Sequence, residues 1–167
     1  GRLRLFSCRR RLRCIRGSGH TEPWGFTIYS GGSRKYLAEA LQEAYKSDTP
    51  EVEFKPEKYE KMGLNPLYAH AVIVIVMKRG DLPKIPVIEE IEAVACAVQN
   101  MHLAASAAGL GMFWSSPAAA SGENFAEYLN LGDDDKCLGL LYVGWPKEGK
   151  EWPKSTRKPA MDKVTWK

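Results

Sequence analysis

Cysteine is scarce in this sequence, and the few cysteines form no recognisable framework. Four occur in 167 residues, and no two of them make a Cys-x-x-Cys pair. A chain of this length can bury a sizeable core, so it does not need disulfide cross-links for stability. Cys96 and Cys137 lie within apolar runs, and we expect both to be small core residues. This usage favours a reducing compartment, for which we take the cytoplasm.

Long hydrophobic runs are also absent. Gln99, Asn100 and His102 break the longest apolar stretch, so we expect no transmembrane segment and no membrane partner. The sequence contains no Ser-His-Asp set, no nucleophile elbow and no cluster with metal-ligand spacing. Residues 133–135 are three consecutive aspartates, but adjacent carboxylates on a turn point apart and are usually solvated. We therefore predict no metal site.

Basic residues are in the minority once the N-terminus is set aside. The first sixteen residues hold seven arginines and no acid, whereas the remaining 151 carry 17 basic and 20 acidic side chains. The body is therefore mildly acidic, and we expect no nucleic-acid partner. We treat residues 1–19 as a separate basic segment. It could bind an anion, be a remnant of an organelle targeting segment, or be a solvated tail.

Strand and helix patterns alternate along the rest of the chain. Ser33 and Ser121 are candidate N-caps of two helices, of which the first ends near Lys46 and the second is stopped by Gly132. This alternation predicts a single α/β (α+β) domain over residues 20–167 with a sheet of mixed strand direction. The other expected segments are strands at 24–30, 71–77 and 137–144, a charged surface helix within 51–62, a loop at 78–86 and an extended arm at 145–167.

The most informative segment runs from Lys84 to Ser116. Its apolar residues recur at steps of three and four, which predicts a long helix, and Gly109 is placed to stop it. No polar residue interrupts 93–98, so the helix is expected to be buried on all sides, in a core or at a subunit interface. A turn follows that carries an aromatic pair, Phe113 and Trp114, and two serines. This arrangement could form one wall of a planar cofactor site, or it could be a core helix ending in an ordinary turn.

Six segments, taken in order, resemble those of the FMN-dependent nitroreductase family. Together they extend from residue 20 to the C-terminus. No single segment is specific, but their common order and spacing identify the resemblance. The segments are HTEPWGF at 20–26, NPLYAHAVIVIVM at 65–77, the helix of the 84–111 run, GLGMFWSS at 109–116, CLGLLYVG at 137–144 and TRKP at 156–159.

The resemblance implies a nitroreductase-like three-layer fold, with a mixed central sheet flanked by helices and a long buried helix at the core of a homodimer. The implied activity is passage of a hydride from NADH or NADPH through FMN to a nitroaromatic, quinone or similar small-molecule acceptor, by a ping-pong mechanism. The flavin carries this chemistry, so no catalytic side chain is expected. The alternative is a degenerate dimer of the same fold that binds flavin weakly or not at all and acts as a binding or structural protein.

The resemblance also implies positions for the cofactor. The backbone of Trp114, Ser115 and Ser116 would pass along the flavin, with an N–H near the reactive ring nitrogen. Arg157 matches a C-terminal arginine that binds the phosphate. The loop that touches the partner's flavin is matched by His20, Thr21 and Glu22. Core packing for Trp114, a turn role for the two serines, a water-facing loop position for His20 and surface charge for Arg157 are the competing interpretations.

The N-terminus departs from the family pattern. Arg9 and Arg10 match the phosphate-binding arginines by type but not by spacing, because only thirteen residues separate Arg10 from Trp24. A full N-terminal helix does not fit into that interval. We therefore expect an atypical or truncated N-terminus and weaker flavin binding than is usual for the family.

Overall fold

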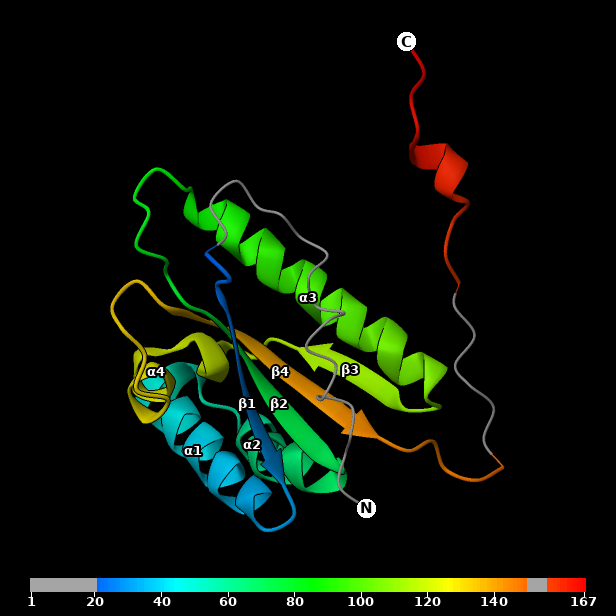
Figure 1. The fold of residues 1–167 in the computed structure, drawn as a ribbon. Helices are drawn as coiled ribbons and strands as arrows, with labels where there is room; N and C mark the ends of the chain where they lie inside the picture. The colour runs from blue at the N-terminus through cyan, green and yellow to red at the C-terminus, as the bar shows by residue number, and fades with distance from the viewer. Residues whose placement is uncertain (1–20, 150–155) are drawn as a thin grey trace.

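The computed structural model describes residues 21–149 and 156–167. Within these ranges the chain forms three layers, a four-stranded sheet with helices on both faces (Figure 1). The expected α+β class is confirmed. The strands are β1 (Trp24–Ser30), β2 (Ala71–Met77), β3 (Gly111–Ser115) and β4 (Lys136–Gly144), and the helices are α1 (Ser33–Asp48), α2 (Pro56–Tyr68), α3 (Val87–Ala107) and α4 (Glu123–Tyr128), with 3-10 turns η2 (Glu51–Glu53), η3 (Ala118–Ser121) and η4 (Ala160–Lys163).

The strand order is β1-β2-β4-β3, and every pairing in this sheet is antiparallel. The expected mixed direction is therefore wrong for the described residues. Strand direction depends on how the intervening helices return the chain to the sheet, and hydrophobic patterns do not encode that path. The expected strand at 71–77 is confirmed as β2, which pairs with β1 and β4 and is buried along its whole length. Its β-branched residues suit that central position.

The sheet separates two hydrophobic cores. On one face, alternate residues of β2 pack with α1, α4 and η3, and Leu37, Leu41 and Phe125 are fully buried there. The opposite face is covered by α3, whose Val94 and Val98 pack against the other set of β2 side chains. Figure 1 shows α3 alone on its side of the sheet, and α1, α2 and α4 on the other side.

We expected α3 to be buried on all sides, but within one chain only one of its faces is buried. Its buried residues, such as Val94 and Ala105, follow one face, whereas Ile88 is 57% exposed and Leu103 is 61% exposed. Cys96 is also exposed, against the expectation of a core position. Periodicity identified the helix but could not tell a face turned to the sheet from one turned outward.

The stop at Gly109 is confirmed. Gly109 has φ +75, and its N–H donates to the Ser106 carbonyl while the Leu110 N–H donates to the Ala105 carbonyl. These two bonds form a Schellman motif, which needs a left-handed residue after the helix. The segment that follows is the strand β3, whereas an open turn was expected. A five-residue strand is too short for its alternation to be recognised reliably.

Three further expectations change. Asn65 and Tyr68 belong to the end of α2, although 65–77 was compared with a strand, because the helix continues through Pro66. Ser33 is the first residue of α1, and its hydroxyl bonds to the backbone of Ser30 instead of capping the helix. The Ser121 hydroxyl likewise donates to the Ala118 carbonyl, so Gly122 takes the cap position of α4.

Candidate functional site

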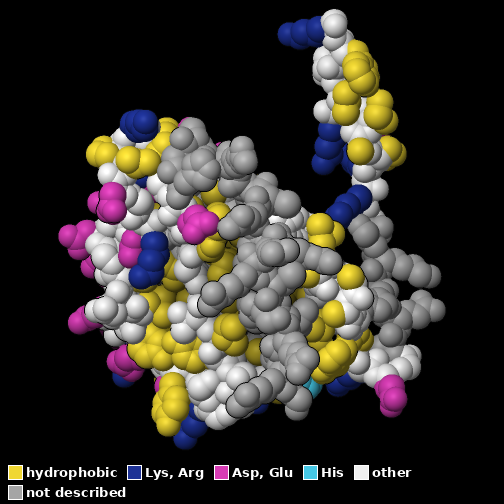
Figure 2. Space-filling model, in the orientation of Figure 1, with side chains coloured by type: hydrophobic (Ala, Val, Ile, Leu, Met, Phe, Trp, Pro, Cys, Tyr) yellow, Lys and Arg dark blue, Asp and Glu magenta, His cyan; other side chains and the backbone are white. Residues whose placement is uncertain are grey.

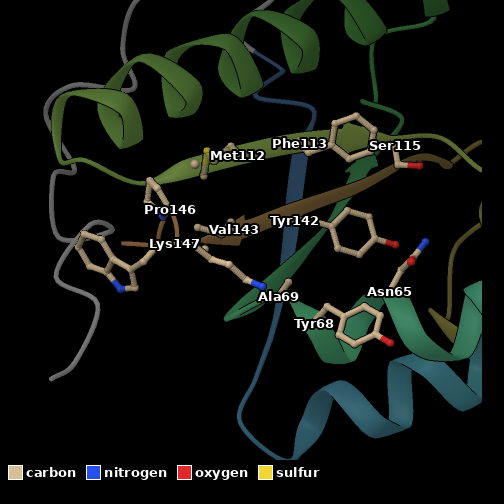
Figure 3. A pocket seen from close by; sticks show the side chains of 13 residues that line it. Asn65, Tyr68, Ala69, Met112, Phe113, Ser115, Tyr142, Val143, Pro146 and Lys147 are labelled. Carbon is tan, nitrogen blue, oxygen red and sulfur yellow. The ribbon is translucent and has the colours of Figure 1, made fainter. Parts of the chain in front are cut away.

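A cavity of about 770 Å³ opens beside the edge strand of the sheet, on the face that carries α2 (Figure 3). Its volume lies within the range of small-molecule sites. The end of α2, most of β3, the end of β4 and the segment after β4 supply its walls. The lining residues are Asn65, Tyr68, Ala69, Gly111, Met112, Phe113, Ser115, Tyr142, Val143, Gly144, Trp145, Pro146 and Lys147.

Aromatic rings dominate this lining. Phe113 and Tyr142 are direct partners in the β3–β4 ladder, and their ring centroids lie 6.4 Å apart with the planes inclined by 29°. The Phe113 side chain is 65% exposed, which leaves most of its surface available to a ligand. Figure 3 shows Tyr68 and Asn65 across from Tyr142, on the α2 side of the cavity. Such a surface suits a flat ring system, because aromatic faces stack favourably.

The polar groups of the cavity are few. Among the described residues that line the cavity, Lys147 is the only charged one, and none is a carboxylate. The Tyr142 phenol is neutral at physiological pH and can donate a hydrogen bond, and burial raises its pKa further, from 10.0 to about 12. A neutral or anionic planar ligand therefore fits the charge of the cavity better than a cationic one.

The end of β3 is fixed by a double hydrogen bond to one carbonyl. The Leu138 oxygen accepts from Trp114 Nε1 at 3.0 Å and from Ser116 Oγ at 2.9 Å. Gly139 makes this possible, since it has φ +121 and a Cβ there would lie only 2.5 Å from the Ser115 carbonyl oxygen. The β2–β4 register shifts between Ile75 and Val76, opposite this point. Trp114, Ser115 and Ser116 are thus held together as one unit.

The C-terminal end of α2, which lines the cavity, is hydrogen-bonded to the start of α1. Arg34 at the start of α1 donates from Nη1 to the Leu67 carbonyl at 2.9 Å and also to the Ala69 carbonyl. A guanidinium at the C-terminal end of α2 satisfies carbonyls that the helix leaves unpaired and complements its dipole. The wall that carries Asn65 and Tyr68 is therefore anchored to α1.

The structure brings together only part of the expected site. Ser115 lines the cavity, and Trp114 and Ser116 adjoin it through Leu138. Thr21 and Glu22 precede β1, and two strands, β2 and β4, separate β1 from β3 in the sheet. A single chain therefore does not place these two groups around one ligand.

Arg157 lies in the C-terminal segment 156–167, whose residues are all exposed. Figure 2 shows hydrophobic side chains along this segment, which stands away from the sheet and helices; Met161, Val164 and Trp166 are among its exposed residues. Arg157 is not among the residues that line the cavity. Arg9, Arg10 and His20 lie outside the described residues.

Sequence reasoning missed most of the cavity. Phe113 was noted only as one of an aromatic pair, and Asn65, Tyr68, Tyr142 and Lys147 were given no role. The alternation of Phe113 and Ser115 on one side of a strand would have been a signal had β3 been recognised. Nothing local links the end of α2 to β4, because 67 residues lie between Tyr68 and Lys136.

Metal-binding groups and membrane-spanning helices are both absent from residues 21–149 and 156–167. There, no group of three His, Cys, Asp or Glu side chains is arranged to hold a metal ion. Asp135 of the acidic turn instead accepts hydrogen bonds from the backbone N–H groups of Arg79 and Gly132. None of the helices in the same ranges has the length and apolar character needed to cross a bilayer.

Comparison with known proteins agrees with the fold and with the segments quoted above. The model of the nitroreductase family matches residues 17–145. YdjA of Escherichia coli (strain K12), provisionally named an NAD(P)H nitroreductase, is 30% identical over 129 residues, which cover 75% of this chain and 67% of YdjA.

Two solved structures extend the comparison. The nitroreductase-like family protein from Bacillus cereus superposes with a TM-score of 0.69 at 26% identity, over 89% of this chain and 75% of that one. The FMN and NADPH-dependent nitroreductase NfnB from a sphigopyxis strain shares the fold alone, with a TM-score of 0.60 at 18% identity over 93% of this chain and 84% of that one. With a family model that matches most of its length and a relative at 30% identity, the chain belongs to the nitroreductase family.

Proposed function

We propose that this protein is an FMN-dependent oxidoreductase that passes a hydride from NADH or NADPH through the flavin to a nitroaromatic, quinone or similar planar acceptor. The observation that carries the proposal is the aromatic cavity beside β3 in a chain of the nitroreductase family. NfnB is named as FMN and NADPH-dependent, and YdjA is named for NAD(P)H. The cytoplasm, expected from cysteine usage, remains part of the proposal.

The residues of the cavity fit a flavin ring. Phe113 and Tyr142 offer ring surface, and Ser115 brings the expected backbone segment to the cavity wall. None of the described lining residues is a carboxylate that would repel an electron-rich ligand. Lys147 supplies a cation at one end. Bound FMN would supply the hydride chemistry, which the protein side chains cannot perform themselves. We assign the ring system to this cavity.

The chain's own contribution is orientation and electrostatics. The bonds from Trp114 and Ser116 to the Leu138 carbonyl hold the backbone of 114–116 in place. A fixed backbone N–H beside a ring that gains negative charge stabilises that charge without having to reorganise. The neutral Tyr142 phenol and the Asn65 amide can add hydrogen bonds to the polar edge of a ring. The proposed reaction requires no side chain to act as a nucleophile, an acid or a base.

The proposal includes a homodimer with the flavin sites at the interface. The apolar outer face of α3, with Ile88 and Leu103 exposed, supports it, since monomers rarely leave such a face open to water. A two-fold arrangement would bring Thr21 and Glu22 of one chain to the cavity of the other, which a single chain cannot do. Arg157 is our candidate for the phosphate, because a guanidinium binds phosphate through paired hydrogen bonds.

The test is an FMN titration of the full chain, followed by flavin fluorescence, and then anaerobic reduction of the bound flavin by NADH and by NADPH. Phe113→Ala should weaken FMN binding about fivefold, since stacking contacts contribute roughly 1 kcal/mol. Tyr36→Ala is the matched control, because Tyr36 is equally exposed at 65% and does not line the cavity. A ping-pong mechanism requires parallel double-reciprocal plots of the steady-state rates.

A colourless protein that takes up no FMN would refute the proposal and favour the degenerate dimer instead. Uptake of FMN with no reduction by either nicotinamide would refute the enzyme activity alone. If Phe113→Ala and Tyr36→Ala bind FMN as wild type does, the cavity is not the flavin site.

A further inference from the structure

A buried ion pair joins the loop after β2 to the first turn of α3. Glu90 is the one buried charged residue of the described chain, with its side chain 1% exposed, and Arg79 Nη1 donates to its Oε2 at 2.5 Å. Arg79 Nη2 also donates to the Ile85 carbonyl at 2.7 Å, and the Gly80 N–H donates to Glu90 Oε1 at 3.1 Å. These contacts tie residues 79, 80 and 85 of the 78–86 loop to one another and to α3.

The same loop holds the segment that precedes β1. The Lys78 N–H donates to the Pro23 carbonyl at 2.7 Å, which extends the β1–β2 pairing by one residue on each strand. Thr21 packs directly on Gly80, where a Cβ would lie 2.7 Å from Thr21 Cγ2 and 2.9 Å from Glu90 Oε1. Gly80 is therefore enclosed between the buried carboxylate and the Thr21 side chain.

Glu22, between these two attachments, has an unusual backbone. Its φ is +45, a region that residues other than glycine seldom adopt. Such a conformation persists only where the surroundings determine it. Thr21 and Pro23, on either side, are the residues held by the loop, so the loop determines the turn at Glu22. The Glu22 side chain itself is exposed and available for contact.

We propose that Arg79 and Glu90 are positioning residues that hold the Thr21–Glu22 turn in the geometry in which it contacts the flavin of the partner subunit. The inference rests on the proposed function. A buried ion pair is a poor source of stability compared with packed apolar side chains, because Glu90 loses its hydration and Arg79, 19% exposed, loses most of it. The pair instead fixes the orientation of the loop, because it bonds to the Gly80 N–H and the Ile85 carbonyl, which apolar side chains cannot do.

The first test is Gly80→Ala, which keeps both charged side chains in the sequence and crowds Thr21 Cγ2 at 2.7 Å and Glu90 Oε1 at 2.9 Å, so that the contact between the loop and the turn must shift. We expect the FMN dissociation constant to rise about tenfold, as is common when a supporting contact behind a site is removed. Gly25→Ala is the matched control in the adjoining strand, because its Cβ would make only an ordinary contact of 3.5 Å with Val76 Cβ. It should bind FMN as wild type does.

The second test separates positioning from stability. The double variant Arg79→Met/Glu90→Met replaces the pair by apolar side chains and should keep the wild-type urea midpoint. We expect it nevertheless to bind FMN about tenfold more weakly and to show faster amide hydrogen exchange at Gly80 and Thr21. If the double variant does not fold, Gly80→Ala against Gly25→Ala decides alone.

The outcomes are distinct from those of the proposed function. Wild-type protein that takes up no FMN refutes the function, and the positioning role with it. Wild-type protein that binds FMN, with affinity unchanged in Gly80→Ala or in a folded double variant, refutes the positioning role only. A loss of affinity that tracks a lowered urea midpoint in the double variant assigns Arg79 and Glu90 to stability, which also overturns the proposal.

Discussion

Replacing Gly139 by alanine is the sharpest perturbation that the structure offers. The new Cβ would lie 2.5 Å from the Ser115 carbonyl oxygen, 2.7 Å from Ser116 Oγ and 3.0 Å from Trp114 Nε1. The φ of +121 is a conformation that costs an L-residue about 1–3 kcal/mol. Moving Trp114 and Ser116 away from the Leu138 carbonyl removes two hydrogen bonds, at about 1 kcal/mol each. We therefore expect the free energy of unfolding to fall by about 3–5 kcal/mol.

The assay is equilibrium urea unfolding at neutral pH, with Gly32→Ala as the control. Gly32 has an ordinary helical φ of −66, and nothing lies within 4 Å of a Cβ built on it. That control should change the free energy of unfolding by less than about 1 kcal/mol. A Gly139→Ala protein as stable as the control would show that β3 moves freely to accept a side chain. The description of 114–116 as one rigid unit would then be wrong.

The remaining predictions concern the sheet edge, the outer face of α3 and alkaline pH. Trp114→Phe keeps an aromatic side chain but removes the indole N–H that donates to the Leu138 carbonyl and some of the packing of Trp114 on the core, so it should lower the free energy of unfolding in urea by at least about 1 kcal/mol; an unchanged free energy would mean that the bond contributes nothing. Leu103→Asp places a charge on the exposed face of α3 and should yield monomers in sedimentation velocity, and a wild type that is already monomeric refutes the dimer. Burial raises the pKa of Tyr142 from 10.0 to about 12, so between these values the unfolded phenol ionises while the folded one stays neutral. Stability should therefore fall as pH rises from about 10 to about 12, and Tyr142→Phe should show a smaller fall; equal slopes in the two proteins would contradict this.

The elements that a local pattern defines could be predicted from the sequence. The β-branched run of β2, the alternation of β1 and the apolar periodicity of α3 each lie within a few residues, and the helix stop at Gly109 follows from its lack of a side chain. Such patterns indicate which side chains of a segment are buried when it folds. The family resemblance rested on their order, and the comparisons confirm it.

The features that depend on distant contacts could not be predicted. Cys96 belongs to an apolar run but lies on the outward face of α3, because only the packed structure decides which face meets the sheet. The strand directions depend on the path of the helices between them. The cavity forms only where the end of α2 lies beside β3 and β4. The Arg79–Glu90 ion pair forms only when the 78–86 loop has folded back onto α3. The roles assigned to Thr21, Glu22, Ser115 and Arg157 stay predictions.

The order β1-β2-β4-β3 has a consequence for how the protein reaches this fold. The central strand pairs with β1, which ends forty residues before it begins, and with β4, which begins almost sixty residues after it ends. Closing such long loops is slow, so folding kinetics should resemble those of all-β proteins more than those of helical bundles. During synthesis one edge of the apolar strand β2 stays unpaired until residues 136–144, which form β4, have been synthesised. In that interval β2 can be bound by a chaperone that recognises extended apolar segments.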